Sequence, residues 1–586
     1  MTKQIIDINI IRHSISHLMS MAIMKLYPKA GLGVGPFIEN GFYQDYDLPE
    51  SISEEIFPKL EKRIKEMIKQ DIEFKQHNLD FAEALKLYKH DPYKTELIAD
   101  LKTAGEKEVS FYKSDWFENL CKGPHVKSTK EINPEAFKLT SIAGAYWRGN
   151  EKNKMLTRIY GVAFATKKEL DDYLLMKEEA EKRDHKKIGA ALGLFAFSPL
   201  VGSGLPLFLP KGATLLRELA EFVRTEKINR GYAFVQIPHI AKSDLYQKSG
   251  HLGKYDAMMP LMTDSEGDQF AMKAMNCPHH FELFNATQHS YRDLPIRYAE
   301  TTTVYRNEKS GELSGLLRVK ALTQDDTHHF VRHDQIQDEI KMILGLMDAV
   351  YSAFGFSEFL VQISIRDTLD TTKYFGADDL WQKSEKILID AVKNWGKPYV
   401  IEEGEAAFYG PKIDIMVKDA IGRHWQLTTV QLDFNQPENF DLHYIGEDGQ
   451  KHRPAVLHVA ILGSLERFLG VLIEHFSGAF PLWLAPTQIK ILNVGADHED
   501  FCKKLADEFK AQDLRVELDL ANETIGNKIR KASAEKIPYT LVIGDKEMSG
   551  GPLAVRVRGQ KDMINVAKDQ FLKELVENVA NRKLSL

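Results

Sequence analysis

Residues 305–330, YRNEKSGELSGLLRVKALTQDDTHHF, contain two arginine-bearing segments separated by a short glycine-containing loop. We predict a strand that includes the β-rich residues 301–305 and carries Arg306 and Glu308, a loop over 309–315, and a second strand bearing Arg318. Guanidinium groups match phosphate oxygens bidentately, so two such strands around a loop indicate a polyphosphate site.

The segment continues with a run of polar residues, Gln324, Asp325, Asp326, Thr327 and His328. The run offers many hydrogen-bond acceptors and one candidate metal ligand. Spacing alone leaves two interpretations open, a functional site and a solvated charged hairpin, and it slightly favours the hairpin.

A second group of candidate ligands lies near the N-terminus. His13 and His17 are spaced i, i+4 on a helix predicted over 11–26, so they share one face. Cys121 and His125 follow in the sequence CKGPH, and the four side chains together have the ligand types of a zinc site. The alternative is two core histidines and an unrelated loop cysteine.

The composition indicates a multidomain protein of a reducing compartment. The chain has 586 residues, more than one core usually holds, with 43% hydrophobic and 27% charged residues. The net charge of −7 argues only weakly against an RNA partner, because a basic groove can be local. Three cysteines are too few for a disulfide framework, and neither a signal peptide nor a membrane-spanning run is present, so we predict a cytoplasmic protein without membrane contact.

The pattern changes at two places along the chain. A densely charged helix predicted over 167–187 gives way to an apolar, glycine-containing segment, which marks a domain boundary. A helix is predicted over 212–230. After residue 486, four β-rich segments alternate with helices predicted over 497–512, 522–535 and 562–580, which indicates a compact α/β domain.

Several motifs resemble those of one family. The pattern R-N-E, loop, R-V, T-Q-D-D-x-H resembles motif 2 of the class II aminoacyl-tRNA synthetases, and HVAILGSLER at 458–467 resembles motif 3. More specific matches are to the threonyl-tRNA synthetases: SGH at 249–251, MNCPH at 275–279, FYGPKID at 408–414, TVQLDF at 429–434, RHSISHL at 12–18, CKGPHV at 121–126 and AGAYWRGNEKNKMLTRIYG at 143–161.

The resemblance implies a multidomain α+β and α/β protein. We expect an α+β editing domain of the threonyl/alanyl synthetase type at 1–166, a linker helix at 167–190, a class II catalytic domain with an antiparallel sheet at 191–485, and an α/β anticodon-binding domain at 486–586. A motif 1-like helix and strand around Pro238 imply a homodimer. We also expect the chain to lack the ubiquitin-like N-terminal domain common in this family.

The activity implied is that of a threonine–tRNA ligase. ATP and L-threonine give threonyl-adenylate and pyrophosphate, and the threonyl group then passes to tRNA(Thr), with no DNA partner. The implied ATP site, with Mg²⁺, is Arg306, Glu308, Arg318 and Arg467, and the implied catalytic residues are Arg306, Arg318, Arg467, Lys412 and His251. The alternatives are a synthetase-like editing hydrolase and an RNA-binding regulator with weakened synthetic activity.

The resemblance also implies one zinc ion, held by Cys277, His328 and His458. Three protein ligands leave open coordination positions on the zinc, which threonine fills with its amino and hydroxyl groups. Valine has no hydroxyl group and cannot complete the coordination. Further threonine contacts are expected from Asp326, Gln324, Tyr409 and Gln431. Serine lacks only a methyl group, worth about 1–3 kcal/mol, so a second site must remove it.

That second site is expected to be a metal-free hydrolytic pocket made by His13, His17, Cys121 and His125. Histidines that titrate near neutrality suit both tasks of ester hydrolysis there, positioning water and protonating the leaving ribose hydroxyl. Anticodon contacts are implied for Asn522, Glu547 and Arg556.

Four residues depart from the family pattern. Asn119 stands where we expect an aspartate, Leu322 where we expect an aromatic residue under the adenine, and Lys320 and Val459 where we expect arginines. Stacking of the adenine would therefore rest more on Arg467.

Overall fold

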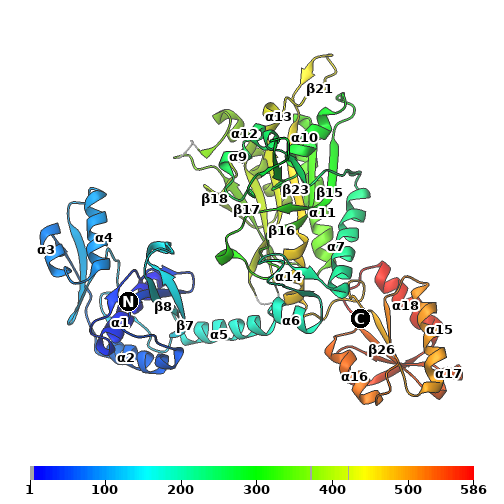
Figure 1. The fold of residues 1–586 in the computed structure, drawn as a ribbon, viewed down its shortest axis with the longest axis horizontal. Coiled ribbons are helices and arrows are strands. Elements are labelled where there is room, and N and C mark those ends of the chain that lie inside the picture. The colour runs from blue at the N-terminus through cyan, green and yellow to red at the C-terminus, as the bar shows by residue number, and fades with distance from the viewer. Residues whose placement is uncertain (1–5, 370–372, 420–421) are drawn as a thin grey trace. The chain divides into compact units, whose positions relative to one another are not determined.

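The computed structural model describes residues 6–369, 373–419 and 422–586 (Figure 1). It divides into two compact units, Met1–Glu178 and Glu179–Leu586. Among the described residues, no helix has the length and apolar character needed to cross a membrane.

The first unit is built around the buried helix α1 (Ile8–Leu26), which carries the predicted histidine pair. The Asp7 carboxylate accepts the N–H of Asn9 at 2.9 Å and so caps the helix start. The helix shares a core with a sheet in the order β1-β3-β8-β7, with β2 beside β3, and a second sheet has the order β4-β5-β6. The bounds are β1 (Gly31–Leu32), β2 (Phe37–Ile38), β3 (Gly41–Asp47), β4 (Lys75–Leu79), β5 (Val109–Ser114), β6 (Phe117–Leu120), β7 (Phe137–Tyr146), β8 (Met155–Ala163), α2 (Phe57–Lys69), α3 (Phe81–Leu87) and α4 (Pro92–Thr103).

The charged segment after this sheet is two helices, so the prediction of a single helix over 167–187 is wrong. α5 (Lys167–Lys182) ends before Arg183, and α6 (His185–Ala191) begins after Asp184. The Asp184 carboxylate accepts the N–H of Lys186 at 2.8 Å, and this N-cap starts a new helix instead of extending the old one.

An eight-stranded sheet forms the centre of the second unit, in the order β11-β15-β16-β23-β20-β19-β17-β18. Neighbours are antiparallel except at the two edges, where β11 and β18 each run parallel to the adjacent strand. The bounds are β11 (Ala233–Phe234), β15 (Ile296–Tyr305), β16 (Ala321–Val331), β17 (Phe359–Ile365), β18 (Tyr399–Glu403), β19 (Lys412–Lys418), β20 (His424–Asp433) and β23 (Ala455–Ser464). The predicted antiparallel catalytic core is confirmed.

Helices pack against this sheet and share its core (Figure 1). They are α7 (Pro210–Ile228), α11 (Ile336–Ala353), α12 (Asp378–Trp395) and α14 (Leu465–His475). Smaller elements surround them: α8 (Ser243–Lys248), α9 (His251–Lys254), α10 (Cys277–Asn285), α13 (Gln436–Asn439), β9 (Phe195–Ala196), β10 (Leu207–Phe208), β12 (Ile240–Lys242), β13 (Met262–Thr263), β14 (Gln269–Met272), β21 (Tyr444–Ile445) and β22 (Lys451–His452).

The first strand of the arginine-bearing hairpin ends before Arg306 and the second begins after Arg318, so Arg306, Glu308 and Arg318 lie in the loop between β15 and β16 and not on strands as predicted. The ladder continues for one further bond, from the N–H of Arg306 to the carbonyl of Lys320 at 2.8 Å. The N–H of Lys320 then donates to the carbonyl of Gly204 at 2.8 Å. A distant segment therefore takes the next hydrogen bond and ends the strand, which local sequence could not show.

The ladder between β16 and β23 shifts register on either side of Asp325. Two N–H groups of β23, those of Ile461 and Leu462, donate instead to the Asp325 carboxylate at 3.0 and 2.9 Å. Lys227 of α7 also donates to this carboxylate at 3.0 Å, and both charged groups are almost fully buried. Asp325 is therefore structural, and it ties α7, β16 and β23 together.

The C-terminal part of this unit is a second sheet, in the order β25-β24-β26-β27-β28, flanked by helices as predicted for an α/β domain (Figure 1). The helix predicted over 562–580 is wrong in its first part, where a strand forms an edge of the sheet. The bounds are β24 (Ile489–Asn493), β25 (Val516–Asp519), β26 (Tyr539–Ile543), β27 (Leu553–Val557), β28 (Met563–Val566), α15 (Glu499–Lys510), α16 (Ile525–Ala534), α17 (Asp545–Met548) and α18 (Lys568–Ala580).

Candidate functional site

A cavity of about 390 Å³ lies between the loop after β15, strands β16 and β23, and helix α14. Its walls include residues from three of the predicted groups: phosphate-binding, threonine-binding and metal-binding. These residues are Arg306, Glu308, Arg318, Arg467, Gln324, Asp326, Tyr409, Cys277, His328 and His458.

The three arginines of this cavity lie close enough to repel one another. Burial lowers the pKa of Arg467, and the positive charges of Arg306 and Arg318 lower it further. Arg467 Nε donates to the carbonyl of Leu317 at 2.9 Å, while Arg318 pairs with Glu308 at 2.8 Å. The concentration of fixed guanidinium groups suits a polyanion such as a triphosphate.

Cys277, His328 and His458 come together although 130 residues separate the two histidines alone. Register places the two histidines directly opposite each other on β16 and β23, and the three candidate ligand atoms lie within 4.8 Å of one another. His328 Nδ1 lies 2.8 Å from His280 Nδ1, and His458 Nε2 lies 3.0 Å from the Asp433 carboxylate, so each histidine keeps one ring nitrogen for a metal. Burial raises the pKa of the Cys277 thiol well above its ordinary value, so a thiolate there needs a cation. The donor set fits zinc.

Three predicted residues lie outside the lining of the cavity. His251 is buried, and burial lowers its pKa to about 4. Lys412 Nζ pairs with Asp414 at 2.6 Å, and Gln431 Nε2 donates to the carbonyl of Gly410 at 3.0 Å. Their assigned roles stay predictions.

Two of the residues that depart from the family pattern, Leu322 and Val459, do line this cavity. Both are buried and apolar. The wall at these positions therefore offers hydrophobic contact where the resemblance leads us to expect an aromatic ring and a charge.

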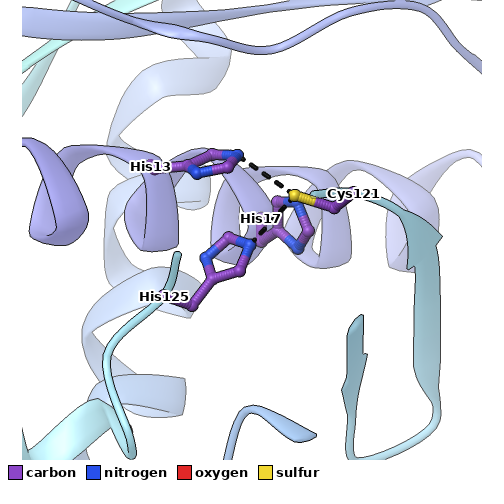
Figure 2. Close-up of side chains that lie close together, drawn as sticks. All are labelled: His13, His17, Cys121 and His125. Carbon is purple, nitrogen blue, oxygen red and sulfur yellow. Dashed lines mark hydrogen bonds between the residues drawn. The ribbon is translucent and has the colours of Figure 1, made fainter. Parts of the chain in front are cut away.

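The second candidate site lies in the first unit. Figure 2 shows His13 and His17 on α1 facing Cys121 and His125, which follow β6. Cys121 Sγ lies 3.4 Å from His13 Nε2 and 3.3 Å from His125 Nε2, and one ligand atom from each of the four side chains lies within 4.8 Å of the others. These distances suit a metal site or a hydrogen-bonded hydrolytic cluster, so the geometry leaves both alternatives open.

Burial sets the protonation of this cluster. It lowers the pKa of His13, lowers that of His17 further, and brings that of His125 to about 2, while it raises the pKa of the Cys121 thiol. The side chains are therefore neutral near pH 7. A neutral imidazole can orient water, but it becomes a weaker base as its pKa falls, and His13 has the smallest shift of the three histidines. At pH 7 these imidazoles hold no proton to give, so the shifts agree with the predicted water-positioning role, while protonation of the ribose hydroxyl requires the proton taken from the water.

Sequence reasoning missed Lys94, which lines a cavity of about 330 Å³ beside His13, His17 and Cys121. Lys94 lies on α4, its Nζ donates to the carbonyl of Gly33 at 3.1 Å, and burial lowers its pKa to about 8. No local signal marks it, because the segment that buries it is distant in sequence.

Asn119 lines the same cavity. It is buried, and its Oδ1 accepts no hydrogen bond from the described residues. This buried oxygen is therefore an unpartnered polar atom at the position where an aspartate was expected.

Three parts of the chain match known protein families. Residues 109–160 match the threonyl and alanyl tRNA synthetase second additional domain, residues 261–476 match the tRNA synthetase class II core domain (G, H, P, S and T), and residues 488–578 match the anticodon binding domain.

Curated relatives match over nearly the whole chain. A threonine–tRNA ligase of Deinococcus radiodurans is 46% identical over 583 residues, which is 97% of this chain and 89% of the relative. A threonine–tRNA ligase of Porphyromonas gingivalis is 47% identical over 579 residues, covering 98% of this chain and 88% of the relative. The chain belongs to the threonine–tRNA ligase family.

A solved structure of this ligase family agrees with the fold of the present chain. The structure described as the RNA binding domain of threonyl-tRNA synthetase from Cryptosporidium parvum Iowa II has 34% sequence identity and a TM-score of 0.65, and the match covers 69% of this chain and 99% of that one.

The residues that the ligase family led us to expect at the anticodon lie in a loop, on a strand and on a helix of the C-terminal sheet domain. Asn522 is exposed between β25 and α16, and Arg556 is half-buried on β27. Glu547 lies on α17, where its carboxylate accepts the N–H of Gly544 at 2.8 Å. Glu547 thus has a local structural partner in addition to any role toward RNA.

Proposed function

We propose that this protein activates L-threonine with ATP and transfers the threonyl group to tRNA(Thr), as the names of its relatives indicate for them. One observation carries the assignment: the arginine cluster and the Cys277, His328 and His458 trio line a single cavity. The alternatives, an editing hydrolase or an RNA-binding regulator with weakened synthetic activity, are not favoured because both groups are present together.

In this proposal the arginines stabilise the charge that develops during adenylate formation. Arg306 contacts the α-phosphate and the reacting carboxylate, and Arg318 and Arg467 contact the outer phosphates together with Mg²⁺. Fixed cations in a partly buried site act strongly on such charge because they need no reorganisation as it develops. Glu308 accepts a hydrogen bond from the adenine amino group. Because Arg318 now pairs with Glu308, this requires Arg318 to leave Glu308 and bind phosphate.

Threonine is placed beside these groups. Asp326 binds its ammonium group and is itself oriented by Asn276, whose Nδ2 donates to the Asp326 carboxylate at 2.9 Å. Gln324, Tyr409 and Gln431 are the further polar contacts. Zinc held by Cys277, His328 and His458 would supply open coordination positions that the hydroxyl of threonine can occupy.

The editing pocket completes the function. His13, His17, Cys121 and His125 are proposed to hold and polarise the water that hydrolyses Ser-tRNA(Thr). His13 accepts the proton of that water as the hydroxyl bonds to the acyl carbon, and it passes the proton to the ribose oxygen as the ester bond breaks. The buried Lys94 ammonium adjoins the same cavity as a cation.

Threonine-dependent exchange of pyrophosphate into ATP tests the synthetic half. We expect the purified protein to catalyse this exchange with threonine and, more weakly, with serine, but not with valine, because the two accepted substrates share a hydroxyl group. Absent exchange would contradict the assignment and favour the regulator, whereas exchange that is equal with valine would contradict the specificity for threonine.

We also propose a homodimer, on the basis of an apolar surface close to the motif 1-like helix α7. Residues 197–209 expose large hydrophobic side chains, and Leu200 is 100% exposed. The others are Phe197, Val201, Leu207 and Leu209. Several large apolar side chains exposed within one short segment favour an interaction site, and a second copy of the chain is the partner that motif 1 implies.

Sedimentation is therefore expected to give twice the chain mass of 66.8 kDa. The double change Leu200→Asp and Leu207→Asp should produce monomers, because each charge would have to be desolvated in the interface. Leu175→Asp is the control, since Leu175 is 60% exposed on α5 and lies outside this surface. A wild-type monomer with full activity would refute the dimer.

The remaining proposals follow the predicted organisation. We retain domains at 1–166, 167–190, 191–485 and 486–586, anticodon contacts by Asn522, Glu547 and Arg556, and a cytoplasmic location, which three free cysteines favour.

A further inference from the structure

His185, the first residue of α6, is a buried histidine that the function so far leaves unused. Its Nδ1 lies 2.7 Å from the carboxylate of Glu474, near the end of α14, which also accepts the His185 backbone N–H. Its Nε2 accepts the backbone N–H of Leu316 at 3.0 Å. The side chain thus joins three segments that are far apart in sequence.

The partners fix the tautomer of this ring. A backbone N–H can only donate, so Nε2 carries the lone pair and Nδ1 carries the proton that is donated to Glu474. Glu474 is held in turn by Arg423 through its second oxygen. Asp184, His185 and Glu474 have the residue types of a metal site, but both ring nitrogens are already engaged. The arrangement is a hydrogen-bonded clamp.

Through the Leu316 amide, His185 holds the loop between β15 and β16, which carries Arg306 and Arg318. Leu316 is followed by Leu317, whose carbonyl accepts from Arg467 Nε at 2.9 Å, and then by Arg318. Leu317, Arg318 and Arg467 all line the larger cavity. A fixed Leu316 amide therefore fixes the backbone that positions both guanidinium groups.

Gly315 shows how closely the ring approaches this loop. Its φ is +52°, and a Cβ added there would lie 2.2 Å from His185 Nε2. A side chain at this position would push the loop away from the imidazole. Gly311, in the same loop, has open space where its Cβ would be.

We propose that His185 is a positioning residue for ATP, which acts by holding Leu316 so that Arg318 and Arg467 meet the phosphates. The proposal rests on the ATP-site assignment made above. If the wild-type protein fails to exchange pyrophosphate, that assignment fails; if it exchanges and the variants below behave alike, only the role of His185 fails.

Two amide replacements test the two hydrogen bonds of the ring one at a time, since Asn can mimic Nδ1 and Gln can mimic Nε2. In His185→Asn the amide can still donate to Glu474 from the Nδ1 position, but nothing reaches the Leu316 N–H. In His185→Gln the side-chain oxygen can replace Nε2 as the acceptor. We expect His185→Asn to raise the KM for ATP and the Kd of Mg-ATP measured by calorimetry about 10-fold, the effect of one lost hydrogen bond, with the KM for threonine nearly unchanged. His185→Gln should stay within about 3-fold of wild type in both quantities.

Melting temperature distinguishes positioning from a purely structural role. A structural role predicts that both variants lose stability and active fraction with no change in the KM for ATP, and this outcome would overturn the proposal. Equal KM values for ATP in the Asn and Gln variants would also overturn it.

Gly315→Ala provides an independent test should His185→Asn fail to fold. The added methyl group is expected to displace the loop and raise the KM for ATP about 10-fold or more, since a positive φ also strains a non-glycine residue. Gly311→Ala is the matched control and should leave the KM unchanged. Equal KM values in these two variants would contradict the proposal.

Discussion

Cys277→Ala is expected to purify without zinc and to lose threonine-dependent pyrophosphate exchange by at least about 100-fold. Removing a residue that only supports a metal ligand already costs up to about 100-fold, so removing a ligand itself should cost at least as much. The physical reason is the donor set. His328 and His458 alone leave two protein ligands, too few to hold zinc tightly. Metal analysis of the purified variant, followed by the exchange assay, measures both effects.

Cys502→Ala is the matched control, because Cys502 is also buried but packs in the core of the C-terminal sheet domain. It should keep one zinc per chain. Full zinc content in Cys277→Ala would reject the assigned site. Wild-type protein with two zinc ions, one of which remains in Cys277→Ala, would mean that the histidine and cysteine cluster of the first unit holds metal.

The double change His13→Ala and His17→Ala is expected to slow hydrolysis of Ser-tRNA(Thr) by about 100-fold or more, the scale of a lost acid–base group. Threonine activation should stay at the wild-type rate, because these residues lie in the other unit. Because burial lowers the pKa of both histidines, wild-type deacylation should hold its rate as the pH falls and decline only below the ordinary histidine value of about 6.5.

His90→Ala, at an exposed position of the same unit, should leave deacylation unchanged. Normal Ser-tRNA(Thr) hydrolysis in a well-folded double variant would defeat the editing proposal. A double variant that unfolds and releases metal would instead identify a structural zinc site.

Local patterns were sufficient to predict many of the elements that carry the sites. The i, i+4 histidines do lie on one helix, and the helix predicted over 212–230 is α7. The errors arose where a single hydrogen bond, distant or local, overrides the periodic pattern. Gly204 ends the ladder before β16, and Asp184 caps a second helix in a segment that has helical spacing throughout.

The residues that line each site were harder to predict from the sequence than the fold. Nothing in the order Gln324, Asp325, Asp326 shows which acid lines the cavity and which is structural; a register shift against β23 decides it. Lys94 and His185 depend on partners 61 and 131 residues away, so no spacing rule could have selected them. Resemblance grouped the zinc trio, and only the sheet register explains why its two histidines meet.

The Asp325 and Lys227 pair has a consequence for synthesis on the ribosome. Lys227 is translated 98 residues before Asp325, and the two amides that complete the carboxylate's shell come 136 and 137 residues after it. At about 5–20 residues per second, on the order of ten seconds pass between the synthesis of Asp325 and that of the two amides that donate to its carboxylate. The first unit has a core of its own and needs none of these residues. The two units therefore become able to fold at different times, and strands β15 and β16 are synthesised before β23, which pairs with β16 in the sheet.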